Sequence, residues 1–416
     1  MESHSEETAL SSKNKPDPAL ARPPVVSFIV VLNYSVLTVT SFTVCIPTAV
    51  QYVTSFGVPK SWAGWMVGLT PIFCGFVQLG IGPLLKRFPQ KKIMIIFCFV
   101  NILGACLYAL GTQTGWIGTI FIARAIQGAV GGPVYASTYV AKTSGTKVRS
   151  LYMQYVGVGI GIGYGCGPLM GALIEVVCQA AGWNSKVVNS STTPGWLMAM
   201  LFALQAVLLW AFMVEPKVGG PPKPGVMPPP TPWSRVCAAF VVVFCTPINV
   251  GMWDVHTAYL AEGRWMWSPE YLGLYLGLLN LAAVPFGLLP LALSISDRTG
   301  MLRFSALAVL SIAAFWDYQL TTVSEAVLFG FGSVVMLIAA QFMKSFGWGL
   351  VSKLPPPSAR PNVMAFNAMV YMFGRGLGAI ISGYVYDGSN FAIVLTCLNS
   401  FLVVYIAATW KLLEVP

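Results

Sequence analysis

Charged residues are scarce in this chain: only 9% of its 416 residues are Asp, Glu, Lys or Arg, whereas soluble domains carry about 25%. This shortage excludes an ordinary soluble domain, whose surface needs such side chains. Hydrophobic residues make up 56% of the sequence, and the mean hydropathy is +0.72. A chain of this composition is predicted to lie in a lipid bilayer.

Metal-ligating residues are also few. The chain has two histidines, and none of its nine cysteines belongs to a CxxC pair, so we expect neither a metal site, a disulfide framework nor a cofactor. A lone His256 outside the N-terminal region and the lack of a nucleophile–base pair argue against an enzyme. No cleavable signal peptide is visible, and residues 1–24 are polar and rich in proline. We expect them to form a disordered cytoplasmic tail.

Twelve apolar runs are long enough to cross a bilayer, which takes about 20 residues. They cover residues 25–55, 61–84, 93–111, 116–141, 150–179, 195–214, 233–262, 268–293, 303–322, 324–351, 362–388 and 389–412. The predicted fold class is therefore an all-α integral membrane protein with twelve transmembrane helices. The Pro/Gly-rich segment 215–232 is read as a stiff cytoplasmic linker between two six-helix halves, residues 25–214 and 233–416.

The basic residues predict the orientation. Of the 24 Lys and Arg residues, 18 fall on the side of the two chain ends, three on the other side and three inside spans. This asymmetry places both termini in the cytoplasm, and it explains the net charge of +10 without a nucleic-acid partner. The sequence leaves open whether the membrane is the plasma membrane or an internal one. Asn189-S-Ser191, in the longest outer loop, is a candidate glycosylation site.

The two halves resemble each other weakly. Cys45-I-Pro47-T-A-Val50 in the first span corresponds to Cys245-T-Pro247-I-N-Val250 in the seventh. Gly165-C-Gly167 in the fifth span corresponds to Gly376-L-Gly378 in the eleventh. Together these matches indicate a duplication, and two halves with a site between them is the plan of a secondary transporter.

The fifth span has a glycine at every second position from 157 to 167. Its spacing lacks the GxGxxG pattern of a phosphate loop, and in a helix it produces two small-residue ladders on roughly opposite faces. One ladder holds Gly157, Gly161 and Gly165, and the other holds Gly159, Gly163, Gly167 and Gly171. Each ladder is predicted to let a neighbouring helix approach closely. Whether these contacts move as a gate or are only static packing stays open.

Three stretches resemble the major facilitator superfamily, and the resemblance covers nearly the whole chain. Gly163-Y-G-C-G-Pro168-L-M-Gly171 is similar to the glycine–proline motif of its helix 5, and Arg124-A-I-Gln127-Gly128 to its helix 4 motif. Asp297-R-T-Gly300 and Gly82-P-L-L-K-Arg87 are similar to its cytoplasmic loop motif. The latter stretch departs from the pattern, since lysine replaces the usual aspartate.

The resemblance implies a transporter that rocks two halves about a central site. Among subgroups, the chain looks closest to drug/H⁺-antiporter-like and lysosomal orphan members. Helix packing and gating are assigned by the resemblance to Gly163, Gly165, Gly167, Pro168, Gly171, Arg87, Asp297 and Arg298.

Charged side chains within spans are costly and therefore indicate function. Arg124, with Gln127 one turn on, is a candidate substrate ligand; the alternative is an arginine bonded to backbone carbonyls. Arg375 shares a helical face with Asn367 and Tyr371 and is a second candidate; its alternative is an ion pair with Asp254. The third is Lys344, which could instead extend to the membrane interface.

The seventh span presents Asn249, Trp253 and His256 on one face, with Asp254 on another side. Asn249 and Trp253 are candidate substrate contacts. His256 or Asp254 could couple transport to a proton. The alternative is that both lie near the outer end and are simply solvated.

Acidic residues are missing from the first, second and fourth spans. A cavity with Arg124, Arg375 and Lys344 but few acids would have a positive potential. The sequence therefore predicts a monomeric carrier of a small organic anion, with a proton as a further candidate ion. The alternatives are an anion-conducting channel on the same fold, or a proton-coupled exporter of neutral or cationic molecules. A receptor without transport is a weaker reading, because no large soluble domain could signal.

Overall fold

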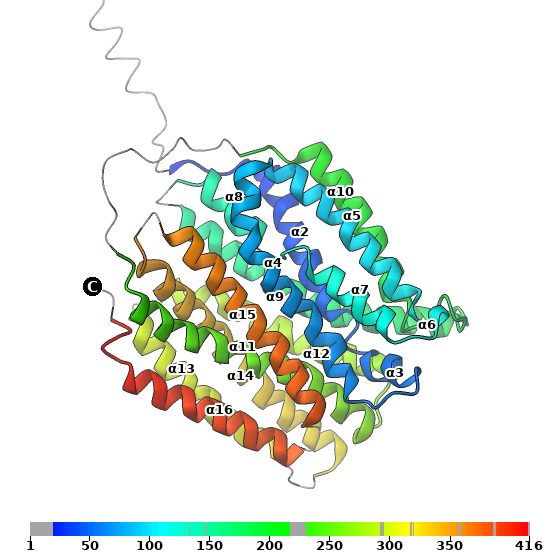
Figure 1. Ribbon diagram of the computed structural model, residues 1–416. Coiled ribbons are helices and arrows are strands. Elements are labelled where there is room, and N and C mark those ends of the chain that lie inside the picture. The colour runs from blue at the N-terminus through cyan, green and yellow to red at the C-terminus, as the bar shows by residue number, and fades with distance from the viewer. Residues whose placement is uncertain are drawn as a thin grey trace, which may run out of the picture.

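The computed structural model describes residues 20–132, 134–145, 148–216, 230–291, 295–316, 318, 320–356, 359–385 and 388–414. Within these residues every regular element is a helix, and the helices pack side by side as one bundle (Figure 1). The predicted all-α class is confirmed. Most of the predicted tail and linker, residues 1–19 and 217–229, lies outside the described residues.

The helices before and after the linker form two sets. The first set is α2 Val25–Thr43, α3 Ala49–Thr54, α4 Trp62–Arg87, α5 Gln90–Ala109, α6 Gly111–Thr114, α7 Gly118–Gly128, α8 Val134–Thr143, α9 Arg149–Ala180 and α10 Thr193–Phe212. The second set is α11 Trp233–Gly263, α12 Pro269–Ala283, η2 Pro285–Leu291, α13 Asp297–Ser311, η3 Ile312–Phe315, α14 Thr322–Lys353, α15 Arg360–Tyr384 and α16 Gly388–Ala408.

Among the described residues, ten helices are long and apolar enough to cross a membrane, so the chain is a multi-pass integral membrane protein. Two predicted spans, 116–141 and 268–293, are absent from these ten, because neither forms one long helix. The first is divided into α7 and α8, and the second into α12 and the 3₁₀ helix η2. Each piece is shorter than the roughly 20 residues that a straight crossing needs.

Both interruptions have a local cause. Between α7 and α8, Gly131 and Gly132 have φ angles of 71° and 55°, a left-handed conformation that glycine adopts without steric cost. After α12, Pro285 has no N–H to donate to the carbonyl of Leu281. The N–H of Val284 donates to that oxygen instead, at 3.1 Å, which tightens the helix.

The first span is also interrupted, between α2 and α3. Pro47 cannot donate to the carbonyl of Thr43, and that carbonyl accepts from the N–H of Ile46 at 3.0 Å. Residues 44–48 lie outside both α-helices. The interruption, residues 44–48, faces the centre of the bundle, where it forms one wall of the site described below.

Helix α9 is one continuous helix that contacts a different helix on each of its glycine faces. A Cβ on Gly163 would lie 2.7 Å from the carbonyl oxygen of Val36 in α2, and one on Gly165 would lie 2.6 Å from Leu281 in α12. The predicted close approach on two faces is thus observed. Gly157 differs from the expectation, because no atom lies within 4 Å of a Cβ at that position.

A second glycine-lined contact joins α4 to α15. A Cβ on Gly68 would lie 2.5 Å from the carbonyl oxygen of Gly376, and one on Gly383 would lie 2.4 Å from that of Ser61. Figure 1 shows α4 and α15 side by side, although the linker separates them in sequence. The α9–α12 and α4–α15 contacts both connect the first set of helices to the second.

The α4–α15 contact continues to one end of the bundle. The start of α2 and the end of α16 lie at the opposite end, which we call the terminus end; α3 and α6 lie at the far end (Figure 1). Ser61 and Gly383 are in contact close to the far end, where the hydroxyl of Tyr259 also donates to the carbonyl of Lys60 at 2.8 Å. The two sets are therefore in contact at the far end.

Replacing Gly163 by valine is expected to destabilise the protein by about 1–3 kcal/mol, because the new side chain would overlap backbone of α2 that cannot move aside. Thermal unfolding of the detergent-purified protein measures the change. Gly80→Val is the matched control, since this exposed helical glycine has open space around it. Equal unfolding temperatures for the two variants would contradict the assigned role of the α2–α9 contact.

Candidate functional site

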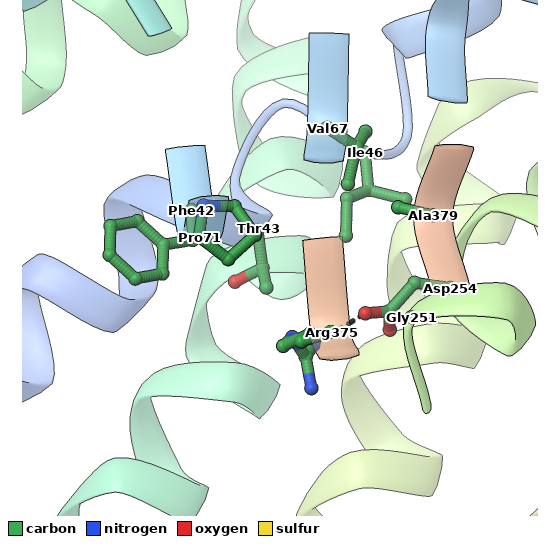
Figure 2. Close-up of a pocket in the computed structure, with 9 residues that line it drawn as sticks. All are labelled: Phe42, Thr43, Ile46, Val67, Pro71, Gly251, Asp254, Arg375 and Ala379. Carbon is green, nitrogen blue, oxygen red and sulfur yellow. Dashed lines mark hydrogen bonds and ion pairs between the residues drawn. The ribbon is translucent and has the colours of Figure 1, made fainter. Parts of the chain in front are cut away.

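A small cavity lies at the centre of the bundle, between the two sets of helices. Its volume is about 10 Å³, room for roughly one water molecule. Figure 2 shows its lining residues, which are Phe42, Thr43, Ile46, Val67, Pro71, Gly251, Asp254, Arg375 and Ala379. They come from the interrupted first span, α4, α11 and α15, so both sets contribute to one site.

An ion pair forms the polar wall of this central cavity. Nη2 of Arg375 in α15 donates to Oδ2 of Asp254 in α11, and the side chains are only 6% and 3% exposed. The guanidinium carbon of Arg375 also lies 3.9 Å from the ring centroid of Tyr164 in α9, a favourable cation–π arrangement. The alternative for Arg375, an ion pair with Asp254, is therefore observed. The guanidinium of Arg375 nevertheless faces the cavity. The solvated alternative for Asp254 is wrong, since the carboxylate is buried.

Lys344 in α14 provides a second positive charge nearby. Its Nζ lies 5.1 Å from the ring centroid of Tyr371 and 6.0 Å from that of Trp348. Among the described residues no carboxylate lies within ion-pairing distance of Lys344. Tyr371 is one helical turn from Arg375 on α15, which places the two cations in one neighbourhood. Lys344, Tyr371 and Arg375, three of the predicted substrate-binding residues, thus lie close together, whereas Arg124, the other arginine expected in the same cavity, does not line it.

Arg124 occupies a different place, buried between α2, α4 and α7. Its Nη1 donates to the carbonyl of Ser41 at 2.9 Å, its Nη2 to that of Phe42 at 2.8 Å, and its Nε to that of Met66 at 3.1 Å. A further bond of 2.9 Å runs from Nη1 to Oε1 of Gln127. Four of the five guanidinium N–H groups are therefore used by the protein.

The carbonyls that Arg124 binds explain its position. Ser41 and Phe42 lie just before the interruption of the first span, where α-helical hydrogen bonding ends. Buried carbonyls need donors, and the guanidinium supplies them. Arg124 is not among the residues that line the central cavity. The backbone-bonded alternative is thus the observed one, and a substrate contact by Arg124 or Gln127 stays a prediction.

The other candidates on α11 bind neighbouring helices. The side-chain amides of Asn249 and Asn399 bond each other reciprocally, at 2.8 and 3.0 Å. Nε1 of Trp253 donates to Oγ of Ser333 at 2.7 Å. These bonds tie α11 to α16 and α14, away from the lining of the central cavity. Asn367, in contrast, is fully buried without a hydrogen-bond partner for its amide among the described residues.

His256 is enclosed by aromatic side chains. Its ring stacks on that of Phe391, with centroids 3.7 Å apart and planes within 3°, and it is fully buried. The solvated alternative for His256 is therefore wrong. The residue does not line the central cavity, so Asp254 is the one of the two proton-coupling candidates that faces it.

The loop-motif residues lie at the terminus end. Oδ2 of Asp297 pairs with Nζ of Lys353 at 2.6 Å. Arg298 pairs with Glu414 at 3.1 Å and covers the ring of Trp410. Arg87 is exposed. The ion pairs of Asp297 and Arg298 thus connect α13 to the end of α14 and to the segment after α16.

Sequence reasoning missed two residues. Glu215 accepts the backbone N–H groups of Gln90 and Lys91, at 2.7 and 2.8 Å; it caps α5, whose N-terminus attracts negative charge. An acid at the first position of the proline-rich linker was the available signal. Tyr164, which stacks on Arg375, stands inside the glycine motif and was overlooked because the glycines dominated the pattern.

Asn189 is half-buried in the loop before α10. Its Nδ2 donates to the carbonyl of Ser185 at 2.9 Å, and its Oδ1 accepts the N–H groups of Ser191 and Thr192 at 2.9 and 3.0 Å. The side chain thus stabilises the turn that holds it. Glycosylation of Asn189 stays a prediction.

Comparison with known proteins supplies the family. The sequence profile of the Major Facilitator Superfamily matches residues 28–379. The chain belongs to this superfamily. The predicted resemblance is therefore confirmed, and the superfamily consists of transporters rather than enzymes.

Three similar proteins have low sequence identity to this chain. An uncharacterized protein of Schizosaccharomyces pombe is 24% identical over 93% of this chain and 82% of its own length. A human organic anion transporter, MFSD10 (TETRAN), superposes with a TM-score of 0.64 at 15% identity, covering 94% of this chain and all of the other. A D-xylose–proton symporter superposes with a TM-score of 0.71 at 13% identity, over 94% and 98% of the two chains. At such identities the structural likeness establishes the fold alone.

Proposed function

We propose that this chain carries a small organic anion across a membrane by alternating access between two six-helix halves, residues 25–214 and 233–416. The two interrupted segments, 116–141 and 268–293, bring the ten long helices to twelve spans, six on each side of the linker 215–232. The excess of basic residues on the side of both chain ends supports a cytoplasmic location for the termini. The carrier is proposed to act as a monomer in the plasma membrane or an internal membrane.

The helix contacts support two equivalent halves. Helix α9, the fifth span, packs on the first span of its own half and on the eighth span of the other. Helix α15, the eleventh span, packs on the seventh span of its own half and on the second span of the other. The pattern is the same with the halves exchanged, as inverted or duplicated transporter repeats require.

The observation that carries the substrate class is the charge around the central cavity. Arg375 faces the cavity and Lys344 lies close by, whereas Asp254 is the only acid among the cavity-lining residues. Two cations with one carboxylate leave a surplus of one positive charge in a region of low dielectric constant. An anion neutralises this surplus, whereas an organic cation would increase it.

Asp254 holds Arg375 until the substrate arrives. A carboxylate on the substrate can replace Asp254 as partner of the guanidinium, and protonation of Asp254 would favour the exchange because it removes the competing charge. Asp254 is therefore preferred to His256 as the coupling residue. In this scheme the two halves rock about the bound anion. The glycine-lined contacts at the far end separate, and the halves approach each other at the terminus end.

Uptake into proteoliposomes tests the proposal. The wild-type protein is expected to take up labelled monocarboxylates saturably and to show counterflow, with little uptake of organic cations or sugars. Measuring uptake at two pH values shows whether protons take part. Single-channel current without saturation would favour the channel alternative. Uptake of cations or sugars in preference to all anions would overturn the substrate class.

A further inference from the structure

A second cavity lies nearer the terminus end, and it shares no lining residue with the central one. Its volume is about 50 Å³, space for about four water molecules. It lies between α9, the α12–η2 segment and α14, and its lining residues are Gly157, Val158, Gly161, Val284, Gly287, Gln341, Lys344 and Ser345. At 1.5 Å per residue, Lys344 is about 14 Å from the end of α14 and Arg375 about 22 Å from the start of α15.

One face of α14 supplies this cavity with hydrogen-bond donors. Gln341, Lys344 and Ser345 share that face by their i, i+3 and i+4 spacing, and all three line the cavity. Trp348 follows one turn later, and its buried Nε1 has no hydrogen-bond acceptor among the described residues. With no carboxylate near Lys344 in the part of the chain that the structure describes, the donors outnumber the acceptors. Such a site suits an anionic group.

Glycines on the facing elements create the space. No atom lies within 4 Å of a Cβ built on Gly157 or Gly287, and a Cβ on Gly161 would lie 3.8 Å from Nε2 of Gln341. Any longer side chain at Gly157 would extend into the cavity. This accounts for the one glycine of the α9 ladders that packs against nothing.

Tyr371 lies close to both cations, although it lines neither cavity. Its ring is the aromatic surface closest to Nζ of Lys344, at 5.1 Å from the centroid, and it lies one helical turn from Arg375 on α15. An anionic group that leaves Arg375 in the direction of the terminus end therefore meets Lys344 as its next positive charge.

We propose that the Lys344 cavity is a second anion subsite, which binds the carboxylate of the substrate between the central site and the terminus end. The proposal rests on the proposed function, because it supposes that the substrate is an anion. It adds a separate binding position that the central ion pair does not provide.

Benzoate, an aromatic monocarboxylate, is the probe for this subsite. Calorimetric titration of detergent-purified protein is expected to show binding to the wild type that weakens about tenfold or more in Lys344→Gln, since one charge-assisted bond is lost. Lys344→Arg should retain most of the affinity. Arg303→Gln, which removes an exposed positive charge from α13, is the matched control and should bind as the wild type does.

A steric test accompanies the charge test. Gly157→Leu is expected to lower benzoate affinity and uptake several-fold, because the side chain fills the cavity, whereas Gly80→Leu in open space should leave both unchanged. The subsite is overturned if the wild type does not bind benzoate, or if Lys344→Gln and Gly157→Leu bind it as their controls do. Transport of anions by the wild type together with either result would leave the proposed function standing. A wild type that transports cations or sugars in preference to all anions would instead remove the proposed function.

Discussion

Replacing Arg375 by alanine is expected to abolish anion uptake and to lower the free energy of unfolding by about 3–5 kcal/mol. The substitution removes the guanidinium that faces the central cavity, and it leaves Asp254 buried without its partner. Proteoliposome uptake measures the first effect. Thermal unfolding of the purified protein measures the second.

The matched control removes both charges. The double variant Arg375→Gln/Asp254→Asn leaves no unpaired buried charge, so its stability should return most of the way toward the wild type. Its anion uptake should remain absent, because a glutamine amide cannot replace a charged guanidinium. Wild-type uptake by the double variant would remove Arg375 from the substrate site, whatever its effect on folding.

Replacing Arg124 by methionine is expected to destabilise the protein by about 3 kcal/mol or more, since buried carbonyls that lose their donors cost about 1–3 kcal/mol each. Arg124→Lys should recover only part of this, because a single ammonium cannot reproduce the fork that binds carbonyls on two helices. Unfolding temperature and the yield of folded protein measure the effect.

The control for Arg124 is Arg298→Gln. Arg298 forms an ion pair whose side chains are 25% and 57% exposed, and such surface pairs contribute about 0–1 kcal/mol. An Arg124→Met protein with wild-type stability but no uptake would contradict the structural role and restore Arg124 as a substrate ligand, as the sequence first predicted.

Patterns within single helices were predictable from the sequence. The apolar runs gave the membrane class, and the alternate glycines of the fifth span gave the two packing faces of α9. Arg375 was identified because an arginine in an apolar run is costly, and its acid partner was already one of the alternatives. Each of these features depends on helical spacing or on burial, which composition reveals.

Features that depend on backbone atoms were not predictable. The acceptors of Arg124 are the backbone carbonyls of Ser41, Phe42 and Met66. Because every residue has a carbonyl, the residue types in the sequence do not show which carbonyls an arginine will bind. The division of segment 116–141 escaped detection because its glycines, at 131 and 132, are also common in continuous membrane helices. The capping of α5 by Glu215 depends on how a loop returns across the bundle.

The interruption of the first span makes Arg124 and the backbone of the first span depend on each other. If residues 44–48 were α-helical, the N–H groups of Cys45 and Ile46 would donate to the carbonyls of Ser41 and Phe42. The guanidinium of Arg124 would then lose these two acceptors in a buried site. Loss of Arg124 alone would instead leave the two carbonyls without this hydrogen-bond donor. The non-helical backbone of residues 44–48 and the guanidinium of Arg124 therefore depend on each other, because each satisfies hydrogen-bonding groups of the other.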